Sequence, residues 1–479
     1  MAERLLPINP ALSLPNPCST APRTPPRPGQ STDTTVNSTP QSAHISSQPP
    51  EVYPENSKIP EQEEWLKEDL KSTTFYTGTG IDFGSQLLIL GDILYRARSI
   101  DGRGTIVIEA APDQAEAWWL YAAKYSFPPA TRLSEASLIW SALRTSKQRP
   151  EWSWVENNLP NLKFWEDVEL AGNEEDFSHE RIKVFMDEYC PDFGYEKRVL
   201  RILVQDKLEP LTSLREEVHY AQVFCDVLQA HRWLYDRCRI LHRDISMNNI
   251  MVRKIDGKIF GVLNDLDLAS RITKEMSATF KHRTGTRPFM AYELLDSDPK
   301  KLVPHLYRHD LESLFYVMLF LCCRYNLDGE SVSSLYDKWL TDSAENLYYA
   351  KKNLCNSADD FDPPVTPDFS GFSKILKDIR EMFLRAHYVR LISRLNKTSF
   401  DSETVNGTIT YEKFLAIVAT FGEQNFPIHH PQSESQPDSL LDEFALEEEE
   451  IKAKMGEWFD EDSDFASSKP SGKDKAREA

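Results

Sequence analysis

Two short polar segments, LHRDISMNNIMV at residues 241–252 and VLNDLDLAS at residues 262–270, hold the side chains best suited to chemistry. Asp244 is followed five residues later by Asn249, and Asp265 comes sixteen residues after Asn249. A carboxylate can orient a hydroxyl group and accept its proton, and carboxylate and amide oxygens suit Mg²⁺. Transfer of a phosphoryl group from a nucleotide needs these groups. The alternative is that HRD and DLD are ordinary polar turns.

The residues around these segments predict the elements that position them. Residues 215–238 keep an apolar stripe at helical spacing, so a helix is expected before Asp244. Apolar residues at 250–252 and 259–263 predict a hairpin between Asn249 and Asp265. Asp244 is therefore expected on a loop between a helix and a strand. This setting favours phosphoryl transfer over a chance match of polar turns.

The two segments resemble the catalytic segments of protein kinases, and two later segments extend the resemblance. GTRPFMAYELL, at residues 285–295, resembles the substrate-docking end of an activation segment, with Thr286 near the catalytic loop and AYE in place of the usual Ala-Pro-Glu. RHDLESLFYVML, at residues 308–319, resembles the buried helix whose first-turn aspartate, here Asp310, braces the catalytic loop. HRDIS, NNIM, GVLNDLDLA and GTRPFMA together are similar to the fungal-type protein kinases, over about residues 85–425.

This resemblance implies an α+β fold of two lobes, with an antiparallel β-sheet and one main helix in the N-terminal lobe and a larger, mainly helical C-terminal lobe. It implies ATP and Mg²⁺ as cofactors, with Asp244 orienting the substrate hydroxyl and Asn249 and Asp265 holding the magnesium. Arg243 would meet a phosphate on the activation segment, or alternatively bond the local backbone. His242 is expected to be a packed structural histidine.

The first third of the chain contains material for the sheet. Gly102 and Gly104, in IDGRGTIVIEA, lie between two expected strands, where backbone N–H groups can approach phosphate, although an ordinary hairpin is the alternative. With the kinase resemblance, Lys124 is the candidate partner of the nucleotide's inner phosphates, and Glu135, eleven residues later, would hold that lysine from a helix. A solvent-facing ion pair is the alternative for both. QDKLEPL, after the last strand, would connect the lobes and bond adenine through its backbone. The expected strands cover residues 87–100, 105–110, 118–127 and 198–204.

Two positions depart from the usual kinase pattern. Asp267 stands where the Asp-Phe-Gly triplet has glycine, which removes backbone freedom and argues against conformational switching there. Ser246 replaces the lysine that serine/threonine kinases usually place near the transferred phosphate, so a slower reaction is expected. The Asp-Leu-Asp triplet also resembles small-molecule kinases of the aminoglycoside and choline type. The 25 residues between Asp265 and Ala291, which end in a docking motif, favour a protein substrate instead.

Composition bounds the partners and the compartment. The 479 residues carry a net charge of −20, which argues against nucleic acid as the main partner. The longest apolar run, at residues 311–323, is shorter than the roughly 20 residues that cross a bilayer, so no membrane partner is expected. Seven cysteines without a CxxC pair, and a start that lacks a continuous apolar stretch, predict an intracellular protein, in the cytoplasm or nucleus. Cys225, Cys238 and the Trp118-Trp119 pair are expected in the core.

The chain divides by composition into four parts. Residues 1–60 hold 13 of the 30 prolines and show no hydrophobic period, so they are expected to form a disordered arm rich in Pro, Ser and Thr. Residues 431–479 carry 15 acidic and 6 basic residues, which predicts a solvated acidic tail. The N-terminal lobe with a flanking segment is expected at residues 61–205, and the C-terminal lobe at residues 206–430.

Together these features predict an ATP-dependent protein kinase that transfers the γ-phosphoryl group to protein hydroxyls, with Ser and Thr favoured. The first alternative is a pseudokinase, a nucleotide-binding scaffold that recruits partners through its arm or acidic tail. The second is a small-molecule kinase.

Overall fold

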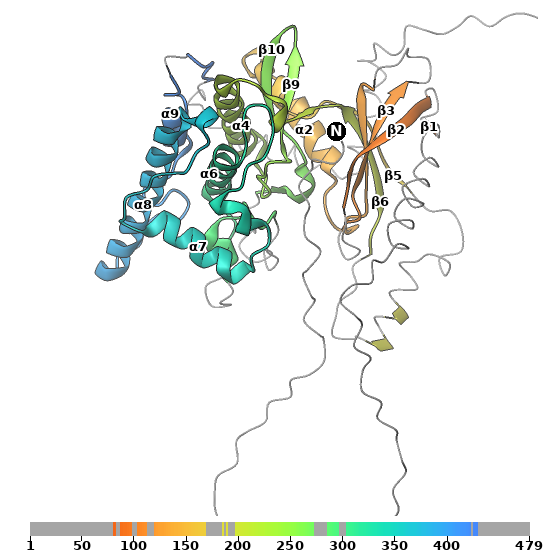
Figure 1. Cartoon of the computed structure of the whole chain (residues 1–479). Coiled ribbons are helices and arrows are strands. Elements are labelled where there is room, and N and C mark those ends of the chain that lie inside the picture. The colour runs from red at the N-terminus through yellow and green to blue at the C-terminus, as the bar shows by residue number, and fades with distance from the viewer. Residues whose placement is uncertain are drawn as a thin grey trace, which may run out of the picture. The chain divides into compact units, whose positions relative to one another are not determined.

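The structure is a computed structural model, and it describes residues 80–82, 87–97, 103–112, 119–168, 184–185, 188–189, 197–272, 285–296, 303–422 and 425–429. The arm predicted at residues 1–60 and the tail predicted at residues 431–479 lie outside the described residues. In the described part, a strand-rich region that extends to residue 206 precedes a mainly helical region (Figure 1).

The strand-rich region is an antiparallel sheet of six strands in the order β1-β2-β3-β4-β6-β5. Leu90, Ile108, Ala123 and Val204 are buried together in a small core on this sheet. The four predicted strands are confirmed. The sequence pattern does not reveal β1, which has three residues, or β5, of which only the first residue is fully buried. The strands are β1 (Gly80–Asp82), β2 (Leu87–Arg96), β3 (Ile106–Pro112), β4 (Tyr121–Ser126), β5 (Leu162–Val168) and β6 (Leu200–Asp206).

Helix α2 (Glu135–Ser146) is the main helix of the N-terminal lobe. Ser134 caps it, because the Ser134 hydroxyl accepts a hydrogen bond from Ser137 N at 3.0 Å. All but one of its residues are buried, as expected for a helix that contacts both β5 and α4 (Glu217–Cys238). Only eight residues separate the end of β4 from the start of α2, so the short spacing between Lys124 and Glu135 is accommodated.

Helices α4 and α6 (Tyr307–Arg324) form the centre of the helical region. The apolar stripe predicted for α4 is confirmed, since residues such as Phe224 and Leu228 are fully buried. Helix α6 is buried along its length except at its last residue, which confirms that the longest apolar run is a buried helix. The α+β fold with two lobes is therefore confirmed. The other helices are α5 (Tyr292–Leu295), α7 (Ala344–Asn356), α8 (Phe372–Asn396), α9 (Tyr411–Val418) and the 3₁₀ helices η3 (Pro150–Asn158), η5 (Leu211–Ser213), η6 (Leu266–Leu268), η8 (Leu335–Leu340) and η9 (Pro367–Phe369).

The predicted hairpin after Asn249 is present as β9 (Ile250–Ile255) and β10 (Lys258–Leu263). Its turn is Asp256-Gly257, with φ angles of 48° and 76°, and two positive φ angles are what a tight two-residue hairpin turn requires. At the other end of the ladder, Asn264 N donates to Asn249 O at 2.8 Å. The hairpin thereby brings Asp265 back beside the loop that carries Asn249. The remaining short strands are β7 (Glu209–Pro210), β8 (Ile240–Leu241) and β11 (Ser270–Arg271).

Gly261 in β10 lets this hairpin approach α4 closely. A Cβ atom at this position would lie 2.5 Å from Val223 O, and the Gly261 N–H donates to the buried Asp226 carboxylate at 2.8 Å. We expect Gly261→Ala to lower the free energy of unfolding by about 1–3 kcal/mol, because the added methyl group would push the hairpin off the helix. Urea unfolding measures this loss. Lys258→Ala, at an exposed position of the same strand, is the control, and equal stabilities for the two variants would contradict the prediction.

The core prediction for cysteine and tryptophan is only partly right. The described cysteines, Cys225 and Cys238 among them, are free and buried. Trp119 is 39% exposed, and its ring lies over Gly91, so its assignment to the core is wrong; Trp118 lies outside the described residues. None of the described helices offers the uninterrupted hydrophobic length that a lipid bilayer would require.

Candidate active site

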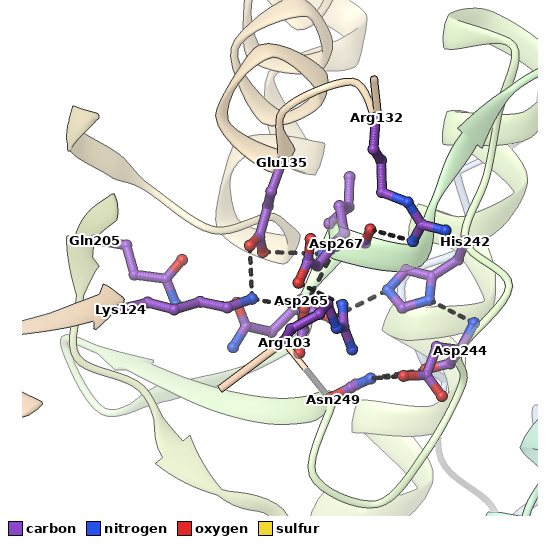
Figure 2. Close-up of polar contacts among 12 residues, drawn as sticks. Arg103, Lys124, Arg132, Glu135, Gln205, His242, Asp244, Asn249, Asp265 and Asp267 are labelled. Atoms are coloured by element: carbon purple, nitrogen blue, oxygen red, sulfur yellow. Dashed lines mark hydrogen bonds and ion pairs between the residues drawn. The ribbon is translucent and has the colours of Figure 1, made fainter. Parts of the chain in front are cut away.

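Lys124, Glu135 and Asp265 meet at one point although they come from three different elements (Figure 2). Lys124 lies on β4, Glu135 opens α2, and Asp265 follows β10. Lys124 Nζ is 2.6 Å from Glu135 Oε2 and 2.7 Å from Asp265 Oδ1. The side chains of Lys124 and Glu135 are only 11% and 8% exposed, so the alternative of a solvent-facing ion pair is wrong.

The pKa values of these three residues differ from those of the same residues in water. Burial opposes the charge of Lys124, but Asp265 and Glu135 raise its pKa above the ordinary value. Burial raises the pKa of Glu135 to about 7, although Lys124 acts to lower it. Burial also acts on Asp265, yet Lys124 and Arg103 hold its pKa well below the usual range. Asp265 is therefore ionised at neutral pH, as a ligand for a divalent cation must be.

Glu135 also ties α2 to the Asp-Leu-Asp triplet. Its second oxygen, Oε1, accepts a hydrogen bond from Leu266 N at 3.0 Å. One carboxylate thus fixes both Lys124 and the backbone next to Asp265. A displacement of α2 would disturb both contacts at once.

Asp244 and Asn249 lie on the loop between β8 and β9, and both are buried. Asp244 Oδ1 accepts hydrogen bonds from Thr286 N and Thr286 Oγ1, each at 2.7 Å. Asn249 Nδ2 donates to Asp244 O at 2.8 Å and to Asp244 Oδ2 at 3.2 Å. Burial raises the pKa of Asp244, although the Thr286 hydroxyl acts to lower it. A carboxylate with a raised pKa accepts a proton more readily.

Asp310 anchors this loop from the first turn of α6. Its carboxylate accepts a hydrogen bond from Arg243 N at 2.9 Å and lies 2.8 Å from His231 Nε2 and 2.7 Å from His305 Nε2. The contact with Arg243 N confirms that Asp310 braces the loop that carries Asp244. Burial acts to raise the pKa of Asp310, but His305 and His231 hold it well below the usual range.

The two residues before Asp244 are packed inside the protein. His242 is 1% exposed, its Nε2 lies 3.0 Å from Asn264 O, and its Nδ1 accepts from Asp244 N at 3.3 Å, which confirms a structural role. Burial lowers the pKa of His242, so the ring is neutral. Burial also lowers the pKa of Arg243 to about 10. The contact of Arg243 with an activation-segment phosphate stays a prediction, because residues 273–284 lie outside the described residues.

The predicted glycine turn connects β2 to β3. Gly104 has a φ angle of 58°, a conformation that favours glycine, whereas Gly102 lies outside the described residues. Arg103, between the two glycines, forms an ion pair with Asp267. Arg132 Nη1 adds a hydrogen bond to Asp267 O at 3.1 Å. Asp267 thus replaces the usual glycine with a residue that contacts both the glycine turn and the segment before α2.

A buried lysine binds the backbone of the docking segment, which comprises residues 285–295. Lys351 on α7 is fully buried, and its Nζ donates to Met290 O at 2.6 Å and to Arg287 O at 3.3 Å. The same ammonium lies 4.3 Å from the centre of the Tyr316 ring. Thr286 donates to Asp244, and it is the residue before Arg287. The contacts of Lys351 therefore connect α7 to the loop that carries Asp244.

Lys351 predicts a pH dependence of stability. Burial lowers its pKa to about 7 from 10.5, although Glu312 and Cys355 act to raise it. Because the pKa is lower in the folded protein, the stability that this group contributes is complete above the unfolded pKa of 10.5. It is lost progressively as the pH falls from there to the folded pKa of about 7. We therefore expect urea unfolding to show a steeper loss of stability from about pH 9 to about pH 6 for the wild type than for Lys351→Met. Lys352→Met, at the exposed neighbouring position, is the control and should keep the wild-type slope. Identical slopes for all three proteins would contradict the prediction.

The oxygens present suit a magnesium ion held jointly with phosphate. Among the described contacts, Asn249 Oδ1 and Asp265 Oδ2 have no hydrogen-bond partner, and the Asp265 side chain is 29% exposed. No group of three or more His, Cys, Asp or Glu residues within the described ranges could hold a metal by itself. Mg²⁺ commonly binds one or two protein oxygens together with substrate phosphates, so this donor set fits Mg-ATP.

Four residues of the site escape sequence reasoning in part or in full. Arg103 lies between the two candidate glycines and Arg132 precedes α2, but an arginine in a polar turn carries no distinct signal. Thr286 is expected near the catalytic loop, yet its two hydrogen bonds to Asp244 are not predicted. Lys351 lies in α7, where the local sequence gives no sign that a lysine is buried. Its burial follows from tertiary contacts.

Comparison with known proteins gives a family and two structural likenesses. The family described as fungal protein kinase matches residues 71–322. The structure of vaccinia related kinase 3 is 18% identical, with a TM-score of 0.42, covering 67% of this chain and 93% of that chain. The kinase PK-1 of Cydia pomonella granulovirus is 12% identical, with a TM-score of 0.38, covering 74% of this chain and 98% of that chain. The search of curated proteins found no match. Since the family match spans more than half of the sequence, this chain belongs to the fungal protein kinase family.

Proposed function

We propose that this chain is an active ATP-dependent protein kinase that transfers the γ-phosphoryl group to serine or threonine hydroxyls of a protein. The observation that carries the proposal is the position of Lys124, whose Nζ contacts both Glu135 and Asp265. A basic group held between the main helix of the N-terminal lobe and a metal-binding carboxylate of the C-terminal lobe is the arrangement that phosphoryl transfer requires. A nucleotide-binding pseudokinase could keep this arrangement as well, whereas a carboxylate positioned to act as a base, such as Asp244, is needed only for transfer.

Each residue of the site has a part in this reaction. Bound Mg-ATP would supply the phosphoryl group and the cation that neutralises its charge. Asn249 and Asp265 would hold the magnesium, and Lys124 would bind the inner phosphates while Glu135 keeps it in place. Gly104 lets the backbone of the glycine turn approach the phosphates. Phosphoryl transfer is then a matter of positioning and charge stabilisation.

Asp244 would orient the substrate hydroxyl and accept its proton. Thr286 N and Oγ1 hold one of its carboxylate oxygens, and Asn249 lies next to the other. The raised pKa of Asp244 supports the role of base. Ser246 is buried on the same loop, so the hydroxyl there stands in for the usual lysine without a cationic contact to the transferred phosphate.

The docking segment supports a protein substrate over a small molecule. Thr286 ties this segment to Asp244, and Lys351 fixes its backbone at Arg287 and Met290. Glu293 at its end pairs with Arg308 at 2.7 Å and with Arg390. The docking segment is therefore held by Asp244, by Lys351 and by the two arginines. A segment with a fixed backbone next to the base is suited to bind an extended polypeptide.

A transfer assay with γ-labelled ATP tests the proposal. We expect the wild type with Mg²⁺ to label itself or a generic protein, and Asp265→Ala to lose this labelling, because the cation ligand is removed. Asp378→Ala, at an exposed salt bridge on α8, is the control and should label as the wild type does. Nucleotide binding without transfer would instead support a pseudokinase. Turnover that a metabolite stimulates and protein does not would support a small-molecule kinase.

A further inference from the structure

The contact between Arg103 and Asp267 joins two segments that are 164 residues apart in sequence (Figure 2). Arg103 belongs to the turn between β2 and β3, and Asp267 is the last residue of the Asp-Leu-Asp triplet. The Asp267 side chain is 4% exposed and the Arg103 side chain 27%. The acidic partner is therefore buried, whereas the Arg103 side chain, which lies near Asp265, stays partly open to solvent.

The backbone on both sides of this ion pair is well anchored. Phe127 N donates to Arg103 O at 2.7 Å, which fixes the turn to the end of β4. On the other side, Arg132 donates to Asp267 O at 3.1 Å, and Asp267 N donates to Asp265 Oδ1 at 3.4 Å. The fold thus fixes the backbones of Arg103 and Asp267, and the Asp267 carboxylate holds the guanidinium group.

The charges of the site show what this arginine can do. Burial acts to lower the pKa of Arg103, but Asp267, Asp265 and Asp244 raise it, so the guanidinium stays charged. Without it, Asp265, Asp267 and Glu135 would surround Lys124 and repel an anionic phosphate chain. A guanidinium group has five N–H donors in a planar fork, so one hydrogen bond to Asp267 leaves donors for phosphate oxygens.

We propose that Arg103 binds the di- or triphosphate chain of the nucleotide and that Asp267 is the positioning residue that orients it. This inference rests on the proposed nucleotide site. It gives Asp267 a purpose that glycine could not serve at this position: the carboxylate holds a phosphate-binding arginine over the residues that would hold the metal. The glycine turn then contributes a charged side chain in addition to its backbone N–H groups.

The affinities for ATP, ADP and adenosine, measured by calorimetry in the presence of Mg²⁺, test this inference. We expect Arg103→Met to weaken ATP and ADP binding by about 10-fold or more, since it removes charge-assisted hydrogen bonds, and to leave adenosine binding unchanged. Arg103→Lys should recover part of the loss, because it keeps the charge without the planar fork. Asp267→Asn and Asp267→Gly should also weaken ATP binding selectively, and either change combined with Arg103→Met should add little further loss.

Arg385→Met, the same substitution at an exposed ion pair on α8, is the matched control and should leave all affinities unchanged. Unchanged ATP affinity in Arg103→Met would overturn the inference. Tighter ATP binding would also overturn it, because Arg103 would then compete with the nucleotide. An equal loss for ATP and adenosine, accompanied by a lower melting temperature, would reduce Arg103 to a structural role. If the wild type binds neither ATP nor adenosine, the proposed function fails as well, so the two failures are distinguishable.

Discussion

Asp244→Asn should slow phosphoryl transfer by at least about 100-fold, because the amide cannot accept the proton of the substrate hydroxyl. Thr286 N can still donate to the amide oxygen that replaces Asp244 Oδ1. Asn249 Nδ2 loses its acceptor at Oδ2, 3.2 Å away, but keeps Asp244 O at 2.8 Å, so the loop should keep its conformation. Lys124 and Asp265 are untouched, and nucleotide affinity should therefore stay within about twofold of the wild type. Single-turnover transfer from labelled ATP, together with calorimetric titration of Mg-ATP, measures the two quantities separately.

The control for this prediction is Asp378→Asn on α8, a partly exposed carboxylate that pairs with Lys374. It should transfer phosphate at the wild-type rate. Wild-type activity in Asp244→Asn would remove this residue from the mechanism. Loss of nucleotide binding together with transfer would show that Asp244 supports the structure of the site and not its proton chemistry.

Asp310→Ala is expected to lower the free energy of unfolding by about 3–5 kcal/mol, the cost of removing a buried carboxylate that three groups share as a hydrogen-bond partner. The substitution leaves Arg243 N without its acceptor and removes the common partner of His231 and His305. Because Arg243 adjoins Asp244, the catalytic loop should also lose its position, and transfer should fall together with stability. Chemical unfolding and the transfer assay, performed on the same preparation, measure both effects.

Asp328→Ala provides the comparison for Asp310→Ala. Asp328 is exposed, and its carboxylate accepts a local hydrogen bond from Glu330 N at 2.7 Å. Its loss should cost less than about 1 kcal/mol. Similar costs for the two variants would show that the network around Asp310 contributes little to stability.

Local sequence patterns predict much of this fold. The apolar stripe of α4, the strands of the sheet and the Asp-Gly hairpin each follow from the periodicity or turn chemistry of a few neighbouring residues. Strand β5 cannot be predicted from local patterns because charged residues occupy two of its half-buried positions and one exposed position. Its pairing with β6 decides its conformation. Trp119 shows the opposite failure, since a large aromatic residue next to a buried strand remains 39% exposed.

Some residues of the candidate site can also be predicted from local sequence, and others cannot. Asp244, Asn249 and Asp265 can be found from sequence because their spacing follows from a loop and a hairpin of fixed length. The ion pair of Arg103 with Asp267 cannot, because the two residues are 164 positions apart and nothing in either segment signals the other. Lys351 is similar: only the tertiary packing of α7 shows that this lysine supports the docking segment.

The hairpin between Asn249 and Asp265 has a consequence for how sequences of this kind can diverge. Its turn is exposed, and a side chain added at Gly257 would meet nothing within 4 Å. Its base is closed by the Asn264–Asn249 hydrogen bond. Paired insertions at the tip would lengthen both strands equally and leave the base unchanged, whereas one extra residue within a strand would reverse the facing of every later side chain. Length variation among relatives should therefore collect at the tip and occur in even steps.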